Sequence, residues 1–330
     1  MDFELSEDEV ALADGMRRLC AGRFPLDRIR GAEGERVAID ASGWSELADA
    51  GVFCLRLPED RGGLGLGTAA AAVVFEELGR ALVPGPILAS HLAARFIEGA
   101  ADGKVMVGAV PRPRRANSAG GGPGSIVIEH LGSLGAVVVV DDDGLAVVDP
   151  ASLDAVAVDR SLDPLTPLWR VDHLPVGEPV GGAEDTALWR RDASVLGGAL
   201  LVGLAAATVD LAVAYAKERE QFGKPIGSFQ AVKHLCADML VRSEVARASV
   251  HAAAVTIDQP DVGDPVRAAA GAGLLAGEAA IANGKTCIQV HGGMGFTWEV
   301  PAHLYLMRAR VLTGALPDAN ALAELVAERY

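Results

Sequence analysis

Arg219-Glu220-Gln221-Phe222-Gly223, followed further along the chain by Gln289-Val290-His291-Gly292-Gly293-Met294-Gly295, is the pair of stretches that decides the fold. The arginine can place two parallel N–H donors on a diphosphate, and the phenylalanine can pack against an adenine or a ribose. In the second stretch the glutamine offers a side-chain amide, and the paired glycines let a backbone approach a ligand closely. Each stretch alone is also typical of an exposed helix end or a glycine-rich turn, so their occurrence together is the informative observation.

Both stretches lie at the ends of long helical patterns. Gly223 and Pro225 are expected to end the first of these helices, because glycine favours a left-handed helix end and proline cannot continue the hydrogen bonding. Long helices joined by short connections predict an antiparallel four-helix bundle over residues 183–330. Helical patterns of this kind cover residues 186–221, 228–256, 265–290 and about 317 to the end.

The rest of the chain combines helices with a run of short strands. Residues 1–100 are predicted to form an N-terminal helical domain, which begins with the capping-box pair Ser6 and Glu9. Residues 101–182 are predicted to form a reduced central β-domain, in which Asp141-Asp142-Asp143-Gly144 is expected to be a hairpin turn. The predicted fold class is therefore mainly α with a small β-domain. Short β-branched runs mark strands at residues 105–110, 126–128, 136–140 and 145–148.

Composition argues against several classes of protein. The chain holds 29 Lys and Arg against 44 Asp and Glu, a formal charge of −15, whereas a nucleic-acid-binding surface needs clustered cations. The dense basic run of Arg112, Arg114 and Arg115 is short and is interpreted as a solvated loop. The longest apolar run, residues 195–209, is shorter than the ~18 residues that suggest a membrane span, so it predicts a buried bundle helix. The acidic N-terminus lacks a signal-peptide pattern and the four cysteines lack metal-ligand spacing, so we expect a cytoplasmic protein without a metal site.

With their extensions, the two opening stretches resemble the acyl-CoA dehydrogenase family. The extensions are residues 223–230 and Phe296-Thr297-Trp298-Glu299, and the resemblance is strong over about 1–95 and 186–312. It implies FAD as cofactor and α,β-desaturation of an acyl-CoA, in which a glutamate removes the α-proton while a hydride passes to the flavin. It also implies that Arg219, Phe222, Gln289, Gly292 and Gly293 contact FAD. The glycine-rich loop at residues 57–67 would shape the acyl pocket or serve packing.

The resemblance also reveals that the family's catalytic glutamate is missing from both of its usual positions. One position, about ten residues after Met307-Arg308, falls on Pro317, and residues 314–319 contain no glutamate. The other position falls on Ala193, which cannot accept a proton, beside Asp192, whose side chain is shorter than that of glutamate. In the β-domain, residues 110–116 replace the segment that cradles the flavin ring in the family.

Three functional hypotheses follow from this pattern. In the family's oligomers the arginine and glutamine groups reach across an interface to the FAD of a neighbouring subunit. The chain therefore resembles the base-lacking subunit of actinobacterial heteromeric (α2β2) acyl-CoA dehydrogenases, several of which act on steroid side-chain CoA thioesters. Its implied partners are a second subunit that carries the glutamate, an acyl-CoA substrate, and an electron-transfer flavoprotein or similar acceptor. The alternatives are a homomeric dehydrogenase that uses Asp192 as base, and a scaffold subunit without a flavin role.

Two histidines receive narrower interpretations. His291, flanked by the glycine pair, is expected to donate a hydrogen bond rather than to carry a proton. Glu299 and His303 are spaced to share a helix face, but a metal site would need a third ligand with clear spacing.

Overall fold

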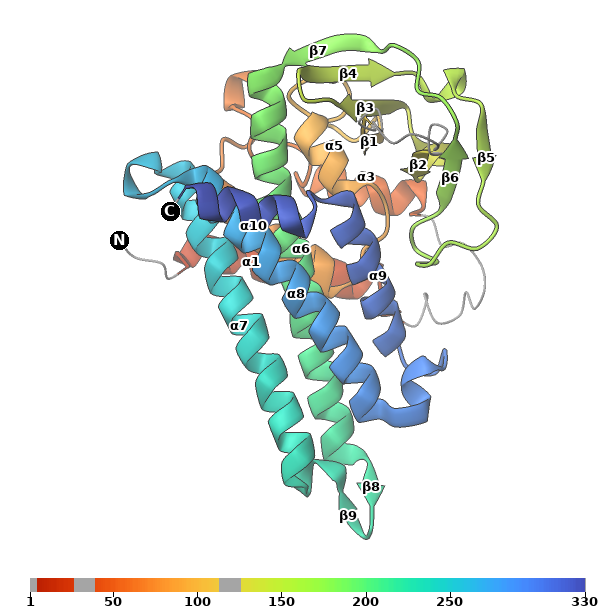
Figure 1. The fold of residues 1–330 in the computed structure, drawn as a ribbon, viewed down its shortest axis with the longest axis vertical. Coiled ribbons are helices and arrows are strands. Elements are labelled where there is room, and N and C mark those ends of the chain that lie inside the picture. The colour runs from red at the N-terminus through yellow and green to blue at the C-terminus, as the bar shows by residue number, and fades with distance from the viewer. Residues whose placement is uncertain (1–4, 27–38, 113–125, 330) are drawn as a thin grey trace. The chain divides into compact units, whose positions relative to one another are not determined.

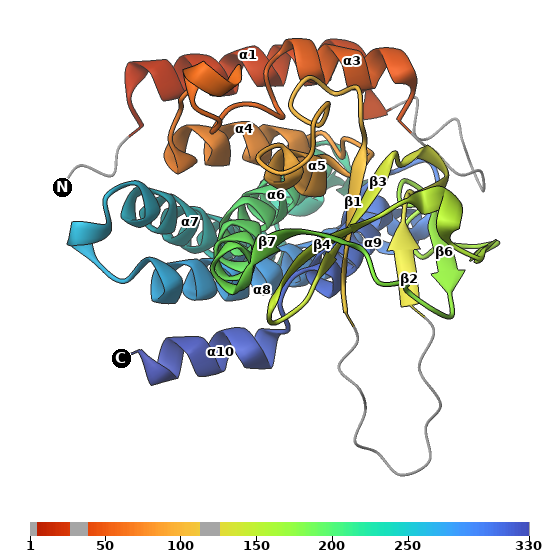
Figure 2. The ribbon, with the colours of Figure 1, turned by 90° about the horizontal axis from the view of Figure 1, so that it is seen from above.

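The computed structural model describes residues 5–26, 39–112 and 126–329, and the chain divides into two compact units (Figures 1 and 2). The first, here called the helical unit, comprises residues 1–33, 67–83 and 191–330. The second, here called the mixed unit, comprises residues 34–66 and 84–190. Each unit has its own hydrophobic core, which includes Met239 and Cys287 in the helical unit and Ile128 and Val137 in the mixed unit.

The helical unit is built around long helices that lie side by side (Figure 1). In one of them, α8 (Pro265–His291), alanine and glycine fill most buried positions, so the backbones of neighbouring helices approach closely. The amide of Asn283 ties this helix to the one before it, donating to the carbonyl of Met239 and to the hydroxyl of Ser243 at 2.9 Å each. Figure 2 shows the C-terminal helix, α10 (Ala319–Glu328), alongside α8. The helices are α6 (Ala183–Glu218), of which residues 191–218 belong to this unit, α7 (Gln230–Asp258), α8 (Pro265–His291), α9 (Ala302–Ala315) and α10 (Ala319–Glu328).

α6 is the most apolar helix of this group. Its length and hydropathy would allow it to cross a membrane, but 89% of its most apolar window is buried inside the protein. Val195, Leu196 and Leu201 are among its fully enclosed side chains. The prediction that residues 195–209 form a buried bundle helix is therefore confirmed.

α4 (Thr68–Arg80) crosses α6 at backbone contact. A Cβ atom at Gly79 would overlap the carbonyl oxygen of Leu200, and one at Gly203 would overlap that of Glu76. Only glycine fits at either position, because the obstructing atoms belong to the backbone and cannot rotate away. This crossing fixes α4, and with it the charged side chains that α4 carries, against the long helices.

Side-chain caps begin several helices of this unit, including α8, where the Asp264 carboxylate accepts the N–H groups of Val266 and Arg267. Ser6 and Glu9 form the predicted capping box at α1 (Glu7–Arg23), with the serine N–H donating to the glutamate carboxylate at 2.8 Å. At α4 the cap comes from the far end of α7, where the Asp258 carboxylate accepts the N–H groups of Thr68 and Ala69 at 2.8 and 3.0 Å. A carboxylate is favourable there because it meets the unpaired N–H groups and the positive end of the helix dipole.

The mixed unit contains α3 (Ala41–Asp49), α5 (Ile87–Ala93) and two sheets. The four-stranded sheet has the order β1-β3-β4-β7, with β1 and β3 parallel and the other pairs antiparallel. The three-stranded sheet has the order β2-β6-β5 and is antiparallel. The strands are β1 (Val107–Pro111), β2 (Ile126–Glu129), β3 (Ala136–Val140), β4 (Gly144–Val148), β5 (Ala155–Ala157), β6 (Leu168–Val171) and β7 (Glu178–Gly182).

The predicted hairpin turn is present between β3 and β4. Val140 pairs with Leu145, and the N–H of Asp141 donates to the carbonyl of Gly144 at 3.0 Å. The basic run is only partly visible: Arg112 pairs with Asp141 at 2.8 Å, while Arg114 and Arg115 lie outside the described residues. For the same reason most of residues 110–116, the predicted replacement of the flavin cradle, receives no structural account.

The fold class is confirmed: helices dominate, and a small β-region occupies the middle of the chain. One helix end is wrong in the prediction, because α6 stops at Glu218 rather than at residue 221. The residues that follow fold into a small hairpin, which is described next.

Candidate functional site

The first opening stretch forms a tight β-hairpin at the end of the bundle (Figure 1). β8 (Glu220–Gln221) pairs with β9 (Lys224–Pro225), which leaves Phe222 and Gly223 as a two-residue loop. Both loop residues have positive φ, 54° and 74°, as a type I′ turn requires. The N–H of Ile226 donates to the carbonyl of Arg219 at 2.7 Å and closes the hairpin.

Phe222 occupies an unfavourable position in this turn. A bulky residue at positive φ costs roughly 1–2 kcal/mol, and asparagine or glycine would adopt that conformation more easily. Its side chain is 92% exposed, and its ring makes an edge-to-face contact with Phe229 at 6.1 Å. Backbone strain of this kind clusters at functional sites, so an exposed aromatic side chain held there is better suited to binding than to folding.

The second opening stretch ends α8. Gly292 has a φ of 62°, and its N–H donates to the carbonyl of Gln289. A Cβ atom added at Gly292 or at Gly293 would meet no atom within 4 Å, so open space lies in front of this backbone. Gln289 is exposed beside it. Gly292 thus supplies the turn rather than a donor of its own.

Two stacked rings join the two stretches. The rings of Tyr215 and His291 lie 4.3 Å apart at an interplanar angle of 25°. The Tyr215 hydroxyl contacts Met294 Sδ at 3.8 Å, and its carbonyl accepts the N–H of Arg219 at 2.8 Å. Tyr215 therefore contacts the backbone of the first stretch and the side chains of the second.

His291 is a structural part of this arrangement. Its side chain is buried, and Nδ1 lies 2.8 Å from the carbonyl oxygen of Cys287, which makes Nδ1 the donor. The predicted hydrogen-bond role is thus met inside the helix. Burial raises the pKa of the neighbouring Cys287 thiol to about 12, so this cysteine is an inert neighbour.

The donors around this end of the bundle suit a diphosphate. Arg219 and Gln289 are exposed, and they offer a guanidinium and an amide on the two segments that the Tyr215–His291 stack joins. Open space lies in front of the backbone at Gly293. Guanidinium groups bind phosphate oxygens with paired hydrogen bonds, and glycine backbone can approach them closely. These residue types fit the diphosphate of the expected FAD. Tyr215 is the residue that the sequence reasoning missed, and its one-turn spacing before Arg219 was the available signal.

The two positions where a catalytic glutamate was sought both lie in the helical unit. Ala193 is buried in α6. Asp192 is also buried, and its Oδ1 is held by Arg191 Nε and Nη2 at 2.8 and 2.7 Å. Pro317 lies in the connection between α9 and α10, next to Leu316, whose Cδ2 lies 2.6 Å from where a Cβ of Gly197 would be. Both positions therefore lie near the same part of α6.

Asp192 is remote from the opening stretches. With 1.5 Å of rise per residue, it lies roughly 40 Å along α6 from Arg219. One chain therefore cannot place Asp192 and Arg219 against the same end of one cofactor.

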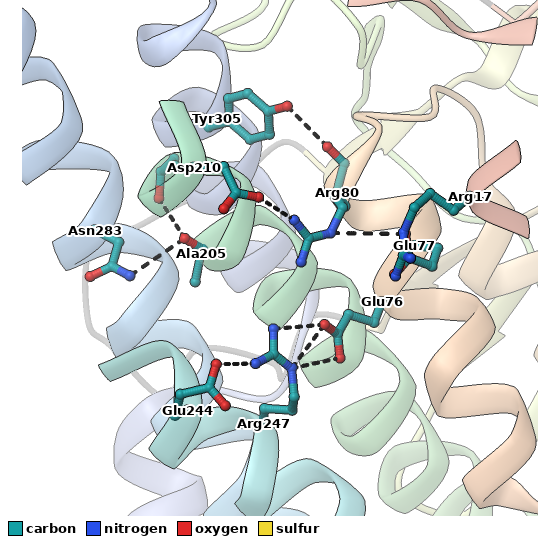
Figure 3. Close-up of polar contacts among 11 residues, drawn as sticks. Arg17, Glu76, Glu77, Arg80, Ala205, Asp210, Glu244, Arg247, Asn283 and Tyr305 are labelled. Atoms are coloured by element: carbon teal, nitrogen blue, oxygen red, sulfur yellow. Dashed lines mark hydrogen bonds and ion pairs between the residues drawn. The ribbon is translucent and has the colours of Figure 1, made fainter. Parts of the chain in front are cut away.

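α4 carries two buried glutamates, but neither has the environment of a catalytic base (Figure 3). Arg247 Nη2 lies 2.9 Å from Glu76 Oε1. Glu77 accepts two hydrogen bonds from Arg17, at 2.7 and 3.1 Å. Burial raises the pKa of Glu76, but the neighbouring His251 and Arg247 together lower it by more than burial raises it. The net pKa of Glu76 therefore lies below its ordinary value. An ionised, paired carboxylate stabilises the fold and accepts a proton poorly.

The paired charges fasten α4 to three other helices. Arg17 belongs to α1 and Arg247 to α7, and Arg80 of α4 pairs with Asp210 of α6 at 2.6 Å. The Tyr305 hydroxyl of α9 donates to the carbonyl of Arg80 at 2.9 Å. Glu244 adds a second carboxylate to Arg247.

The interpretation of Glu299 and His303 as sharing a helix face is wrong. Glu299 is exposed and precedes α9, whereas His303 is buried in its first turn against the ring of Trp298, at 5.2 Å. Burial lowers the pKa of His303 and keeps it neutral. Within the described residues, no group of three metal-ligating side chains gathers.

Two segments of the chain match domain models of one protein family. Residues 6–101 match the model of the acyl-CoA dehydrogenase N-terminal domain, and residues 195–330 match that of the C-terminal domain. IpdE2 from Mycolicibacterium smegmatis is 32% identical over 99% of this chain and 100% of its own length. FadE34 from Mycobacterium tuberculosis is 40% identical over 82% of this chain, which spans only 39% of FadE34.

Solved structures share the fold over nearly the whole chain. The ChsE4–ChsE5 complex from Mycobacterium tuberculosis superposes with a TM-score of 0.84 at 23% identity, covering 99% of this chain and 98% of that one. The Tcur3481–Tcur3483 steroid ACAD G363A variant superposes with a TM-score of 0.80 at 25% identity, covering 98% of each chain.

Proposed function

Because the chain belongs to the acyl-CoA dehydrogenase family, whose cofactor is FAD, we propose that it is the FAD-supporting subunit of a heteromeric acyl-CoA dehydrogenase. The reaction is the α,β-desaturation of an acyl-CoA. In this proposal the chain lacks the catalytic base, and a second subunit of the same family provides a glutamate.

The observation that carries the proposal is the arrangement at the end of the bundle. Arg219, Phe222 and Gln289 are all exposed, and the Tyr215–His291 stack joins the segments that hold them. A strained turn that presents a phenylalanine to solvent has no benefit for the isolated chain. The exposed ring would be buried, and would contribute to binding, when a neighbouring subunit and its cofactor cover it.

Each residue has a definite task in this proposal. Arg219 would bind the diphosphate of FAD with paired hydrogen bonds, and Gln289 would donate from its amide. Phe222 would pack against the adenine or ribose. Gly292 would set the turn and Gly293 would let the backbone approach the diphosphate. FAD, when bound, supplies the acceptor for the substrate hydride.

The environments of three buried carboxylates of this chain support the proposal of a partner. Glu76 and Glu77 are paired with arginines, and Asp192 is paired with Arg191. The connection around Pro317 contains no glutamate. A general base for this reaction needs a carboxylate with a raised pKa that is free to take a proton. A glutamate of the partner subunit would meet that requirement.

The relatives support a substrate class. ChsE4–ChsE5 is a complex, and Tcur3481–Tcur3483 is a steroid ACAD. We therefore extend the proposal to a steroid side-chain CoA thioester as substrate. Electrons would leave through an electron-transfer flavoprotein or a similar acceptor.

Co-expression tests the proposal directly. The chain is purified alone and together with a family member encoded beside it, and both samples are examined by flavin absorption and by dehydrogenation of acyl-CoA. We expect flavin and activity only in the complex. An active, flavin-replete preparation of the single chain would contradict the proposal.

A further inference from the structure

The mixed unit contains a cavity of about 630 Å³ that none of the proposed FAD contacts lines. It lies between the glycine-rich loop that carries Leu57 and Arg61 and the segment after α5, residues 94–102. Both walls belong to the same unit. Cavities that bind small molecules generally measure about 300–1,000 Å³, so this volume suits a small organic ligand.

The loop that forms one wall is firmly folded. The N–H of Gly63 donates to the carbonyl of Pro58 at 3.0 Å, and that of Gly65 donates to the carbonyl of Leu57 at 2.8 Å. A Cβ at Gly63 would overlap the carbonyl of Leu57, so glycine is required there. A wall held by its own backbone hydrogen bonds is preformed, and little ordering is needed when a ligand binds.

Two arginines stand together at this cavity. Arg61 Nη2 donates to the carbonyl oxygen of Arg95 at 2.9 Å, which links the two walls. The guanidinium of Arg95 lies 5.2 Å from the centre of the Phe96 ring. Both arginines are exposed and line the cavity beside apolar side chains, which include Leu57, Ala94 and Ile97.

The acidic residues of the lining do not cancel this positive charge. Asp102 pairs with Lys104 at 2.6 Å, and this contact lowers the pKa of Asp102. Glu98 also interacts with Lys104. Lys104 does not line the cavity, but when it is counted with Arg61 and Arg95, three cations stand against the carboxylates of Glu98 and Asp102, and one positive charge is in surplus.

We propose that this cavity binds a small amphipathic carboxylate, with its apolar body against Leu57 and Ile97 and its carboxylate on Arg61 and Arg95. Guanidinium groups bind carboxylates with paired, charge-assisted hydrogen bonds. The apolar wall selects ligands that carry a hydrocarbon body. The site is independent of the proposed FAD contacts.

Cys54 provides a reporter inside the cavity. It lines the space and is half-buried, and burial raises the pKa of its thiol. Cys20 and Cys287 are fully buried, with pKa values of about 12, so they will react slowly. Cys236 is also half-buried, and replacing it by Cys236→Ser leaves Cys54 as the accessible thiol among the four cysteines.

The experiment measures the rate at which N-ethylmaleimide alkylates Cys54 in the full chain, read by peptide mass spectrometry, with increasing decanoate or decanamide. We expect saturable protection by decanoate and at least tenfold weaker protection by the neutral amide. Arg61→Gln should weaken decanoate protection roughly tenfold, because one charge-assisted hydrogen bond is lost. Arg160→Gln, an exposed arginine outside the cavity, should change nothing.

Three results would overturn the proposal: no saturable protection, equal protection by the amide, or an Arg61→Gln variant that behaves like the parent chain. Thermal unfolding of each variant separates loss of binding from loss of fold. Displacement of 1-anilinonaphthalene-8-sulfonate by decanoate gives a second readout that does not depend on Cys54 chemistry.

Discussion

The ring of His291 lies on the ring of Tyr215, with 4.3 Å between their centroids, and this contact ties the end of α8 to the end of α6. The tyrosine stands one turn before Arg219 and the histidine directly before Gly292. The segments that we propose as FAD contacts therefore move together.

Replacing Tyr215 should separate the two segments. Tyr215→Leu removes the ring stack, which is worth about 0.5–1.5 kcal/mol, and should weaken flavin binding by the complex several-fold. Tyr215→Phe keeps the stack, loses only the contact with Met294, and should bind nearly as the parent does. Flavin fluorescence titration measures both. If Tyr215→Leu retained parental affinity, the stack would have no part in presenting the motifs.

Arg219 should decide flavin occupancy. Arg219→Ala removes a charge-assisted contact worth about 1.5–3 kcal/mol in all, so the flavin dissociation constant of the complex should rise roughly 10- to 100-fold. Lys217→Ala, a nearby exposed cation at the end of α6, serves as control and should have little effect. Unchanged occupancy in Arg219→Ala would favour the scaffold hypothesis instead.

Phe222 should show opposite effects on stability and on function. Phe222→Asn puts a residue that tolerates positive φ into a type I′ turn and should stabilise the isolated chain by about 1 kcal/mol. The same change removes the ring that we expect to pack on the adenine, so flavin affinity of the complex should fall. Urea unfolding of the chain and flavin titration of the complex measure the two effects. A simultaneous loss of stability and affinity would mean that Phe222 serves folding.

Asp192 distinguishes the heteromeric proposal from a homomeric enzyme. Asp192→Asn should leave turnover of the complex within about twofold, whereas loss of a general base costs about 100-fold or more. The variant keeps an oxygen acceptor for Arg191, so its fold is checked by thermal unfolding before turnover is compared. Abolished turnover in a folded variant would make Asp192 the base.

Glu76 should stabilise the helical unit in a pH-dependent manner. Glu76→Gln leaves Arg247 without its main partner in a largely buried position and should cost about 3 kcal/mol at pH 7. The pKa of Glu76 is lowered from 4.5 in the folded chain. Its contribution is therefore fully present above pH ~5 and is lost as the pH falls through the folded-state value.

Urea unfolding of parent and variant at pH 7 and near pH 3.5 measures this contribution. The difference in free energy of unfolding should shrink at the lower pH. A difference that grew towards acid would mean that Glu76 is protonated in the folded chain. Glu244→Gln, which alters a more exposed partner of Arg247, should have a smaller effect.

The helical parts of this fold could be predicted because their signals are local. The capping box of Ser6 and Glu9 and the apolar run of α6 depend on residues a few positions apart, and both are confirmed. β5, β6 and β7 were missed because they are short and show little alternation. The end of α6 is misplaced in the prediction because Phe222 is not a turn-forming residue, and Gly223 alone indicates a helix end as readily as a type I′ turn.

The candidate site was predictable only as a list of residues. The resemblance pointed to Arg219 and Gln289, and their contact with FAD stays a prediction. What joins their segments, the Tyr215–His291 stack, depends on the register of α6 against α8, which no local pattern encodes. The pairing of Asp192 with Arg191 could be suspected because the two residues are adjacent. The burial of Glu76 and Glu77 could not be predicted, because it depends on how α4 crosses α6, and the two helices are far apart in the sequence.

Phe222 and Phe296 are 92% and 73% exposed. Phe222 lies in the loop of the β8–β9 hairpin, and Phe296 ends the turn that follows α8. A chain that waits for its partner would present these rings to chaperones and proteases, which recognise exposed apolar groups. We expect its cellular abundance to follow that of the partner subunit, because an orphaned copy would be cleared.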